Sequence, residues 1–144
     1  MPPPLLFLAY ASNASVAFTP PALVELLSVS RRNNDLAGIT GMLLYRGGNF
    51  LQALEGPPDA VRETFGRISR DVRHRGIGML LEEDRDHRLF AEWSMAFQEV
   101  RQADLDRHPG ASAYLSRGPE DLDVAPAQDH DVFAFFQSFR DNMR

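Results

Sequence analysis

Along the first hundred residues, apolar positions follow a strand pattern in some segments and the three-to-four-residue spacing of a helix in others. The succession of these patterns predicts the order of strands and helices. Short apolar or alternating runs predict strands. They lie at 5–10, 39–45, 49–56, 77–84 and 90–100. Two segments with apolar residues three or four apart predict helices at 20–32 and 57–74. The order β-α-β-β-α-β-β is that of a ferredoxin-like α+β fold with one added strand.

Local signals support several of these boundaries. Thr19 precedes Pro20 and Pro21, which predicts a helix start with threonine as N-cap and proline in the first turn. Gly47 and Gly48 separate the second and third predicted strands. A short glycine turn between two strands predicts a β-hairpin.

The strand 49–56 carries a polar residue where its pattern calls for an apolar one. Because alternate strand residues share a face, Gln52 lies on the same face as Phe50 and Leu54. A buried amide costs free energy unless its donor and acceptor groups find partners. Gln52 therefore lies at a hydrated edge or meets a polar partner in the core.

The pattern changes after the last predicted strand. Residues 101–128 are rich in proline, glycine and acidic residues, and 129–143 predict a short apolar helix with four phenylalanines. The strand 39–45 is apolar on both faces, so the sheet needs cover on both sides. Right-handed crossovers place both earlier helices on one face. We therefore expect a domain at 1–100 and a helical extension, 101–144, on the other face.

Composition limits the classes of function. The chain has 144 residues, of which 44% are hydrophobic and 24% charged, as in one ordinary globular domain. Its net charge of −5 disfavours direct binding to nucleic acid. The absence of cysteine excludes a thiolate nucleophile and a disulfide framework. No segment approaches about 20 consecutive apolar residues, so we expect a cytoplasmic protein without membrane contact.

Signatures of common enzymes and metal sites are missing. The four histidines fall in separate segments without metal-ligand spacing, so we predict no metal site. The candidates that remain are polar, aromatic and sulfur-containing side chains in or next to the predicted apolar strands and helices. Tyr10 ends the first strand, Asn33 and Asn34 follow the first helix, and Trp93 and Met95 are two apart on the last strand and so share a face. Core packing and helix termination are the alternative explanations.

Together these residues resemble the BLUF domain, a blue-light sensor that uses flavin. The resemblance covers residues 5–100 and is carried by three motifs: SRRNNDLAGITGMLLYRGGNFLQALEG, F.RI..D.RH and F.EWSM.F. The tail, which lacks a motif for a second catalytic domain, is similar to that of short, stand-alone BLUF proteins. The resemblance implies a flavin held between the two helices that cover one face of the sheet.

The resemblance also implies roles for individual residues. Tyr10 and Gln52 match the photoactive pair, with Gln52 bonded to both Tyr10 and the flavin edge. Asn34 matches the asparagine that bonds the pyrimidine side, and Asn33 matches a position near the ring that is asparagine or histidine. Further matches to flavin-contacting positions on the second helix are Arg67, Asp71 and His74. Surface salt bridges are the alternative for these three. FAD is the expected flavin, although the ring contacts suit FMN and riboflavin equally.

The implied mechanism is a light-driven transfer of an electron and then a proton from Tyr10, after which the hydrogen bonds around Gln52 settle in a new arrangement. Trp93 and Met95 are the implied relay, and the sequence leaves open which of them lies beside the flavin in the dark. The signal then passes to a partner protein or changes the assembly of a homo-oligomer.

Two other classes of function remain as alternatives. A light-inert, BLUF-like protein-interaction module would keep the fold without the photochemistry, but the presence of both Tyr10 and Gln52 argues against it. A flavin-dependent redox enzyme would need a substrate-side acid or base and a nicotinamide motif, and neither is found. We therefore expect a sensor and not an enzyme.

Overall fold

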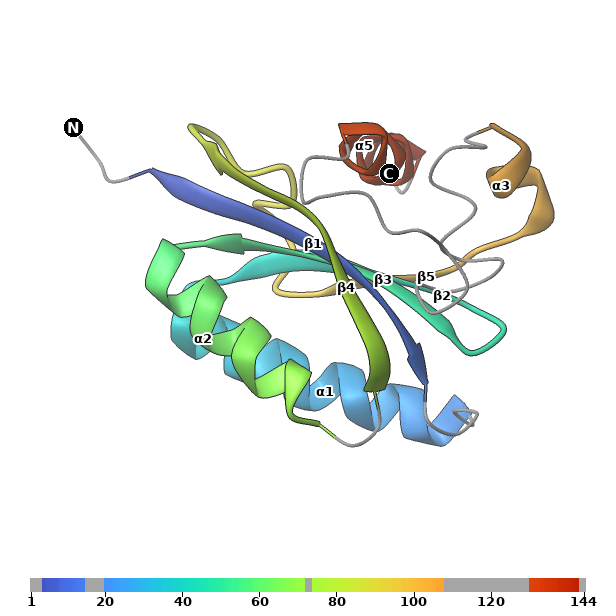
Figure 1. Cartoon of the computed structure of the whole chain (residues 1–144), viewed down its shortest axis with the longest axis horizontal. Coiled ribbons are helices and arrows are strands. Elements are labelled where there is room, and N and C mark those ends of the chain that lie inside the picture. The colour runs from blue at the N-terminus through green and yellow to red at the C-terminus, as the bar shows by residue number, and fades with distance from the viewer. Residues whose placement is uncertain (1–3, 15–19, 72–73, 108–129, 143–144) are drawn as a thin grey trace.

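The computed structural model describes residues 4–14, 20–71, 74–107 and 130–142. Within these ranges the chain forms a five-stranded sheet with helices on both faces (Figure 1). The elements are β1 (Leu5–Ala14), α1 (Pro20–Ala37), β2 (Thr40–Arg46), β3 (Asn49–Gly56), α2 (Pro58–Ser69), β4 (His74–Arg85), β5 (Ala96–Glu99), α3 (Gln102–Arg107) and α5 (His130–Asn142). The predicted order of strands and helices through β5 is confirmed, and the fold is α+β and ferredoxin-like.

The sheet has the strand order β4-β1-β3-β2-β5. Strands β2 and β5 are parallel, and the other neighbouring pairs are antiparallel. The predicted hairpin joins β2 to β3 through Gly47 and Gly48, whose φ angles of 54° and 86° lie in the left-handed region that glycine adopts without steric cost. The β1–β3 register places Tyr10 directly opposite Gln52.

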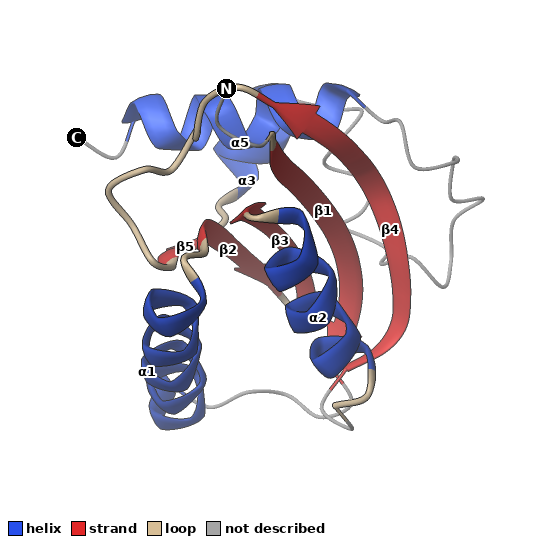
Figure 2. Ribbon diagram, turned by 90° about the vertical axis from the view of Figure 1, so that its left-hand side faces the viewer, coloured by secondary structure: helices blue, strands red, loops and turns tan. Residues whose placement is uncertain are grey.

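The two faces of the sheet are covered by different helices. Figures 1 and 2 show α1 and α2 on one face and α5 on the other. Because strand residues alternate, Tyr10, Phe50 and Leu54 belong to the core under α1 and α2, whereas Phe7 and Leu51 belong to the core under α5. The expectation that the C-terminal helix covers the second face is confirmed, although the division of the chain at residue 100 stays a prediction.

Helix α5 is held to the sheet by its apolar side. Four of its side chains are buried there, namely Val132, Phe135, Phe136 and Phe139. Phe133 packs edge-on against Phe7, with ring centroids 5.1 Å apart, and the guanidinium of Arg85 lies 4.1 Å from its ring centroid. Burial of one phenylalanine contributes about 1.5–3 kcal/mol, so the helix is a firmly docked part of the domain.

The predicted helix 57–74 is too long, because α2 ends at Ser69. Residues from His74 onward pair with β1 instead, and the ladder extends to the pair Ala14 and His74. Backbone pairing with a central strand outweighs the helical spacing of the local sequence here. For the same reason β1 continues four residues past the predicted end at residue 10.

The predicted strand 90–100 is wrong in its first half, because only β5 pairs with β2. The buried carboxylate of Glu55 accepts hydrogen bonds from the backbone N–H of Leu89 at 2.8 Å and of Phe90 at 2.5 Å. Since a side chain occupies these two amides, they are not available to a strand ladder.

Two further elements differ from expectation. Helix α1 continues to Ala37, so Asn33 and Asn34 lie within it and not after it. The short helix α3 had no counterpart in the prediction. The predicted N-cap Thr19 and most of the segment 101–128 lie outside the described residues. Among the helices that the structure describes, none combines the length and apolar character that a bilayer span requires.

Candidate functional site

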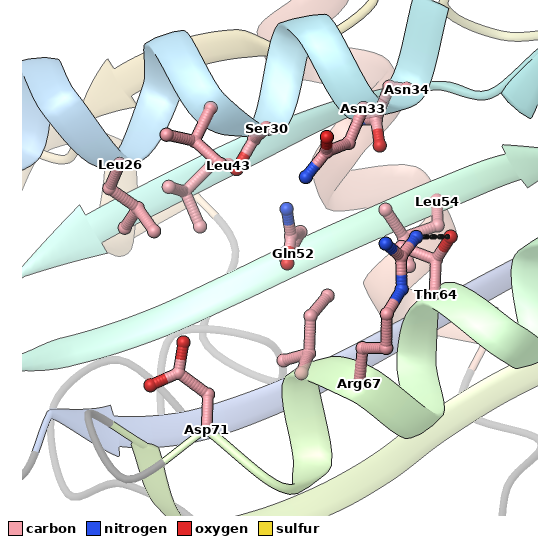
Figure 3. Close-up of a pocket in the computed structure, with 12 residues that line it drawn as sticks. Leu26, Ser30, Asn33, Asn34, Leu43, Gln52, Leu54, Thr64, Arg67 and Asp71 are labelled. Atoms are coloured by element: carbon pink, nitrogen blue, oxygen red, sulfur yellow. Dashed lines mark hydrogen bonds between the residues drawn. The ribbon is translucent and has the colours of Figure 1, made fainter. Parts of the chain in front are cut away.

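A pocket of about 170 Å³ opens between α1 and α2, above the sheet face that carries Gln52 (Figure 3). Its walls are formed by five apolar side chains: Leu26, Val29, Leu43, Leu54 and Ile68. Polar side chains from both helices, β3 and the end of α2 also line it: Ser30, Asn33, Asn34, Gln52, Thr64, Arg67 and Asp71. Apolar walls that bury a ring, together with polar groups that hydrogen-bond its edges, are typical of a site for a flat organic ligand.

Tyr10 and Gln52 form a hydrogen-bonded pair at the base of this pocket. The Tyr10 hydroxyl donates to Gln52 Oε1, and the exposed fractions of the two residues are 0% and 5%. Gln52 Nε2 in turn donates to the Met95 Sδ at 3.4 Å. The buried amide thus has a strong partner at its oxygen and a weak thioether acceptor at its nitrogen.

The environment of Tyr10 keeps its hydroxyl protonated. Burial raises the pKa of Tyr10 well above its usual value, and the negative charge of Asp71 raises it further. The ring packs against Phe65 of α2 at a centroid distance of 5.3 Å. Tyr10 is therefore a fixed phenol that carries its proton toward Gln52.

Trp93 and Met95 do not share a face of the sheet, so that prediction is wrong. Both precede β5, in a segment of turns, and their side chains enter opposite cores. Met95 is buried under α1 and α2 beside Gln52, whereas Trp93 packs against the core under α5. The period-two rule fails because these residues are not in a strand. In this structure Met95, and not Trp93, contacts the buried amide.

The two asparagines of α1 both line the pocket but differ in burial. Asn33 is exposed at the pocket mouth, and Asn34 is buried with 3% of its surface accessible. Asn34 Nδ2 donates to the backbone carbonyl of Ser94 at 2.8 Å. Asn34 therefore joins the pocket to the segment that carries Met95, a connection that the sequence did not indicate.

The three predicted residues of the second helix are divided by the structure. Arg67 lies on α2 at the pocket rim, where its guanidinium donates to Thr64 Oγ1 at 3.2 Å. Asp71 follows the end of α2 and still lines the pocket. His74 is the first residue of β4, so the prediction that all three lie on the second helix is wrong. The His74 side chain lies outside the described residues, and its role stays a prediction.

Several pocket residues had no assigned role in the sequence. Ser30 and Thr64 lie among apolar positions of α1 and α2, and Leu26 lies one helical turn before Ser30. A spacing of three or four residues is that of any amphipathic helix, whose apolar side more often packs against a core. The pocket becomes visible only in the three-dimensional structure, where these residues of α1 and α2 lie opposite one another.

The match to a known family agrees with this geometry. The family described as "BLUF: Sensors of blue-light using FAD" matches residues 5–96 of the chain. The chain therefore belongs to the BLUF family.

Individual relatives match over different shares of their length. The "Blue light- and temperature-regulated antirepressor BluF" of Escherichia coli (strain K12) is 34% identical over 82 residues, which cover 57% of this chain and 20% of the relative. The "Photoactivated adenylate cyclase subunit beta" of Euglena gracilis is 34% identical over 92 residues, 63% of this chain and 11% of the relative. The chain thus spans a fifth or less of the length of these curated relatives.

A solved structure matches over nearly the full length. It is that of BlrB, a BLUF protein in its dark state, with 31% sequence identity and a TM-score of 0.72. The match covers 94% of this chain and 97% of the other.

Proposed function

We propose that this protein is a blue-light photoreceptor that binds oxidised flavin between α1 and α2 and signals through the hydrogen bonds of Tyr10 and Gln52. One observation carries the proposal. It is the buried chain of contacts from the Tyr10 hydroxyl through the Gln52 amide to the Met95 sulfur, at the base of a pocket in a member of the BLUF family.

The pocket residues suit a flavin ring. The apolar walls match the flat faces of the ring, and the polar rim matches its hydrogen-bonding edges. Gln52 Nε2 carries two protons and contacts only a weak sulfur acceptor within the described residues, which leaves an amide proton for a ring acceptor. Asn34 keeps its amide oxygen for the same ligand. Arg67 at the rim suits a phosphate group, which FAD and FMN carry and riboflavin lacks. Because the matching family is described as using FAD, we propose FAD as the cofactor.

Each member of the proposed photoactive pair has a distinct task. A bound flavin would supply the absorption of blue light and an acceptor for one electron and one proton, and its absorption would depend on the hydrogen bonds at its rim. Tyr10 supplies the electron and the proton, and its raised pKa keeps that proton in place until light arrives. Gln52 is the group whose hydrogen bonds change, because an amide offers a donor at one end and an acceptor at the other.

Met95 couples the orientation of the Gln52 amide to the rest of the protein. In the observed orientation Nε2 donates a proton to the Met95 sulfur. An inverted amide would place Oε1 against that sulfur, and two acceptors do not attract each other. Inversion of the amide therefore removes the hydrogen bond that holds the Met95 side chain in place. We propose that Met95 and Trp93 form the relay.

The proposed signal then travels toward α5. Trp93 lies near Phe90 with ring centroids 6.4 Å apart, and Phe90 meets Phe136 of α5 edge-on at 6.0 Å. We propose that the output is a change in the docking of α5 that a partner protein or a homo-oligomer reads. We also propose that the protein acts in the cytoplasm and has no enzymatic activity of its own.

Spectroscopy of the purified protein tests this proposal. We expect a yellow protein that releases FAD on denaturation and whose dark spectrum shifts reversibly to the red under blue light. Chromatography of the released cofactor separates FAD from FMN and riboflavin. A protein that stays colourless during flavin titration would support the light-inert interaction module. Turnover of NAD(P)H under anaerobic conditions would support a redox enzyme.

A further inference from the structure

The backbone just before β5 is held from outside at three consecutive positions. We call residues 93–95 the relay segment. The carbonyl of Trp93 accepts a hydrogen bond from the backbone N–H of Gly41 at 3.1 Å. The next two carbonyls accept from side chains of α1, at 2.8 Å and 2.9 Å. Three external donors on three successive carbonyls fix the path of a segment that has no strand pairing of its own.

The two donors from α1 are Asn34 and Arg31. Asn34 Nδ2 donates to the carbonyl of Ser94, and Arg31 Nε donates to the carbonyl of Met95. Positions three apart lie on one side of a helix, so the two side chains grip adjacent carbonyls from a common face. A donor that carries a full positive charge makes a stronger hydrogen bond than a neutral amide.

Arg31 differs from Asn34 in its relation to the flavin pocket. Asn34 lines that pocket, whereas Arg31 lines a separate cavity of about 410 Å³ together with residues 92–97. Arg31 can therefore be changed without altering the lining of the flavin pocket. It bonds the backbone carbonyl of Met95, whereas Gln52 bonds the side-chain sulfur of the same residue.

We propose that Arg31 is a positioning residue that, together with Asn34, clamps the relay segment to α1 and so keeps the Met95 sulfur on the Gln52 amide. Its part in signalling rests on the proposed photoreceptor function, whereas the clamp itself needs no light. When the amide of Gln52 changes, this clamp is the restraint that the relay segment must break in order to move.

The chain provides its own probe of the clamp, because Trp93 is its only tryptophan. Collisional quenching by acrylamide measures how often the indole becomes accessible to solvent. Loss of one hydrogen bond of this kind raises the population of an open segment about fivefold. We therefore expect Arg31→Ala to raise the quenching constant of Trp93 at least about twofold in the full-length protein in the dark.

Three variants control this experiment. Arg32→Ala removes the same charge from an exposed arginine that is about 100° further round α1, and it should leave the quenching constant unchanged. Arg31→Lys keeps a charged donor and should restore much of the parent value. Arg31→Met keeps the apolar stem without the donor and replaces Arg31→Ala if the alanine variant does not fold.

A second measurement separates the clamp from the photoreceptor function. We expect the red-shifted product of Arg31→Ala to have the normal spectrum but a recovery time about fivefold longer than that of the parent, because the original arrangement has lost a restraint. Equal quenching in Arg31→Ala and Arg32→Ala would overturn the clamp. Raised quenching in Arg31→Ala, together with a parent protein that shows no light response, would support the clamp and reject the photoreceptor. Raised quenching with an unchanged recovery time would overturn the signalling role of Arg31.

Discussion

The amide of Gln52 has partners of very different strength at its two ends. Its oxygen accepts from the buried Tyr10 hydroxyl, and its nitrogen faces the soft Met95 sulfur. A phenol with a raised pKa is a donor that stays protonated, whereas a thioether is a weak acceptor. The hydrogen bonds of the Gln52 amide should therefore respond to a ligand that offers its nitrogen a better acceptor than the Met95 sulfur.

The raised pKa of Tyr10 predicts a specific loss of stability at high pH. Folding keeps the phenol protonated where the unfolded chain ionises near pH 10, so this contribution is fully present below about pH 10 and is lost as the pH rises further. The slope reaches about 1.4 kcal/mol per pH unit. We expect the free energy of unfolding of the flavin-free protein, measured in urea between pH 10 and 11.5, to fall more steeply than in Tyr10→Phe. Parallel slopes would contradict the burial of this phenol.

Asn34 is predicted to serve the flavin and the relay segment at once. Its removal leaves polar atoms unpaired in a closed site, at a cost of roughly 1–3 kcal/mol. We expect Asn34→Ala to weaken flavin binding about tenfold or more in an equilibrium titration. Asn33→Ala is the matched control, because Asn33 is exposed and should cost less. Unchanged affinity in Asn34→Ala would place Asn34 outside the flavin site.

Residue-level reasoning from the sequence succeeded where regular alternation holds. Alternation along the strand predicts the face of Gln52, and the family resemblance implies its hydrogen bond to Tyr10; the structure shows both. It failed at Trp93 and Met95, because the carboxylate of Glu55 on β3 bonds the backbone amides of Leu89 and Phe90 and β5 begins only at Ala96. A long-range side-chain bond of this kind leaves no mark on local periodicity.

At the scale of elements, α5 is the part of the fold best placed to report a change in the relay segment. Its apolar side meets Phe90, which in turn neighbours Trp93. The sequence predicted this helix from its run of apolar residues, and its docking from the strand 39–45, which is apolar on both faces and so requires cover on both sides of the sheet. The boundaries of α2 and β4 were less predictable, since they depend on pairing between residues 60 positions apart.

The docking of α5 should contribute strongly to stability. Phe136 is fully buried between α5 and the sheet, so Phe136→Ala removes a large side chain from a packed core. We expect the free energy of unfolding to fall by about 3–5 kcal/mol in a denaturant titration. The adjacent Gln137 is exposed, and Gln137→Ala should change stability by less than about 0.5 kcal/mol. Similar effects of the two variants would show that α5 does not dock in solution as described.

At the scale of the whole molecule, light should alter regions on both sides of the sheet. The proposed path runs from the Gln52 amide to the Met95 sulfur, along the backbone to Trp93, and from there through Phe90 to Phe136 of α5. We expect blue light to change hydrogen exchange in residues 90–100 and in α5. Met95→Ala should keep the red shift and reduce the change in α5, because it interrupts the relay and leaves the photoactive pair intact. Identical exchange of α5 in light and dark would contradict this route.

The light-minus-dark absorption spectrum of three flavin-loaded proteins tests the central claim most directly. The parent protein should give a reversible red-shifted product. Tyr10→Phe keeps the ring but removes the proton donor, and Gln52→Leu keeps the volume but removes both ends of the amide. Both variants should bind flavin and show no such product. A normal, reversible red shift in either variant would contradict the assignment of Tyr10 and Gln52 as the photoactive pair.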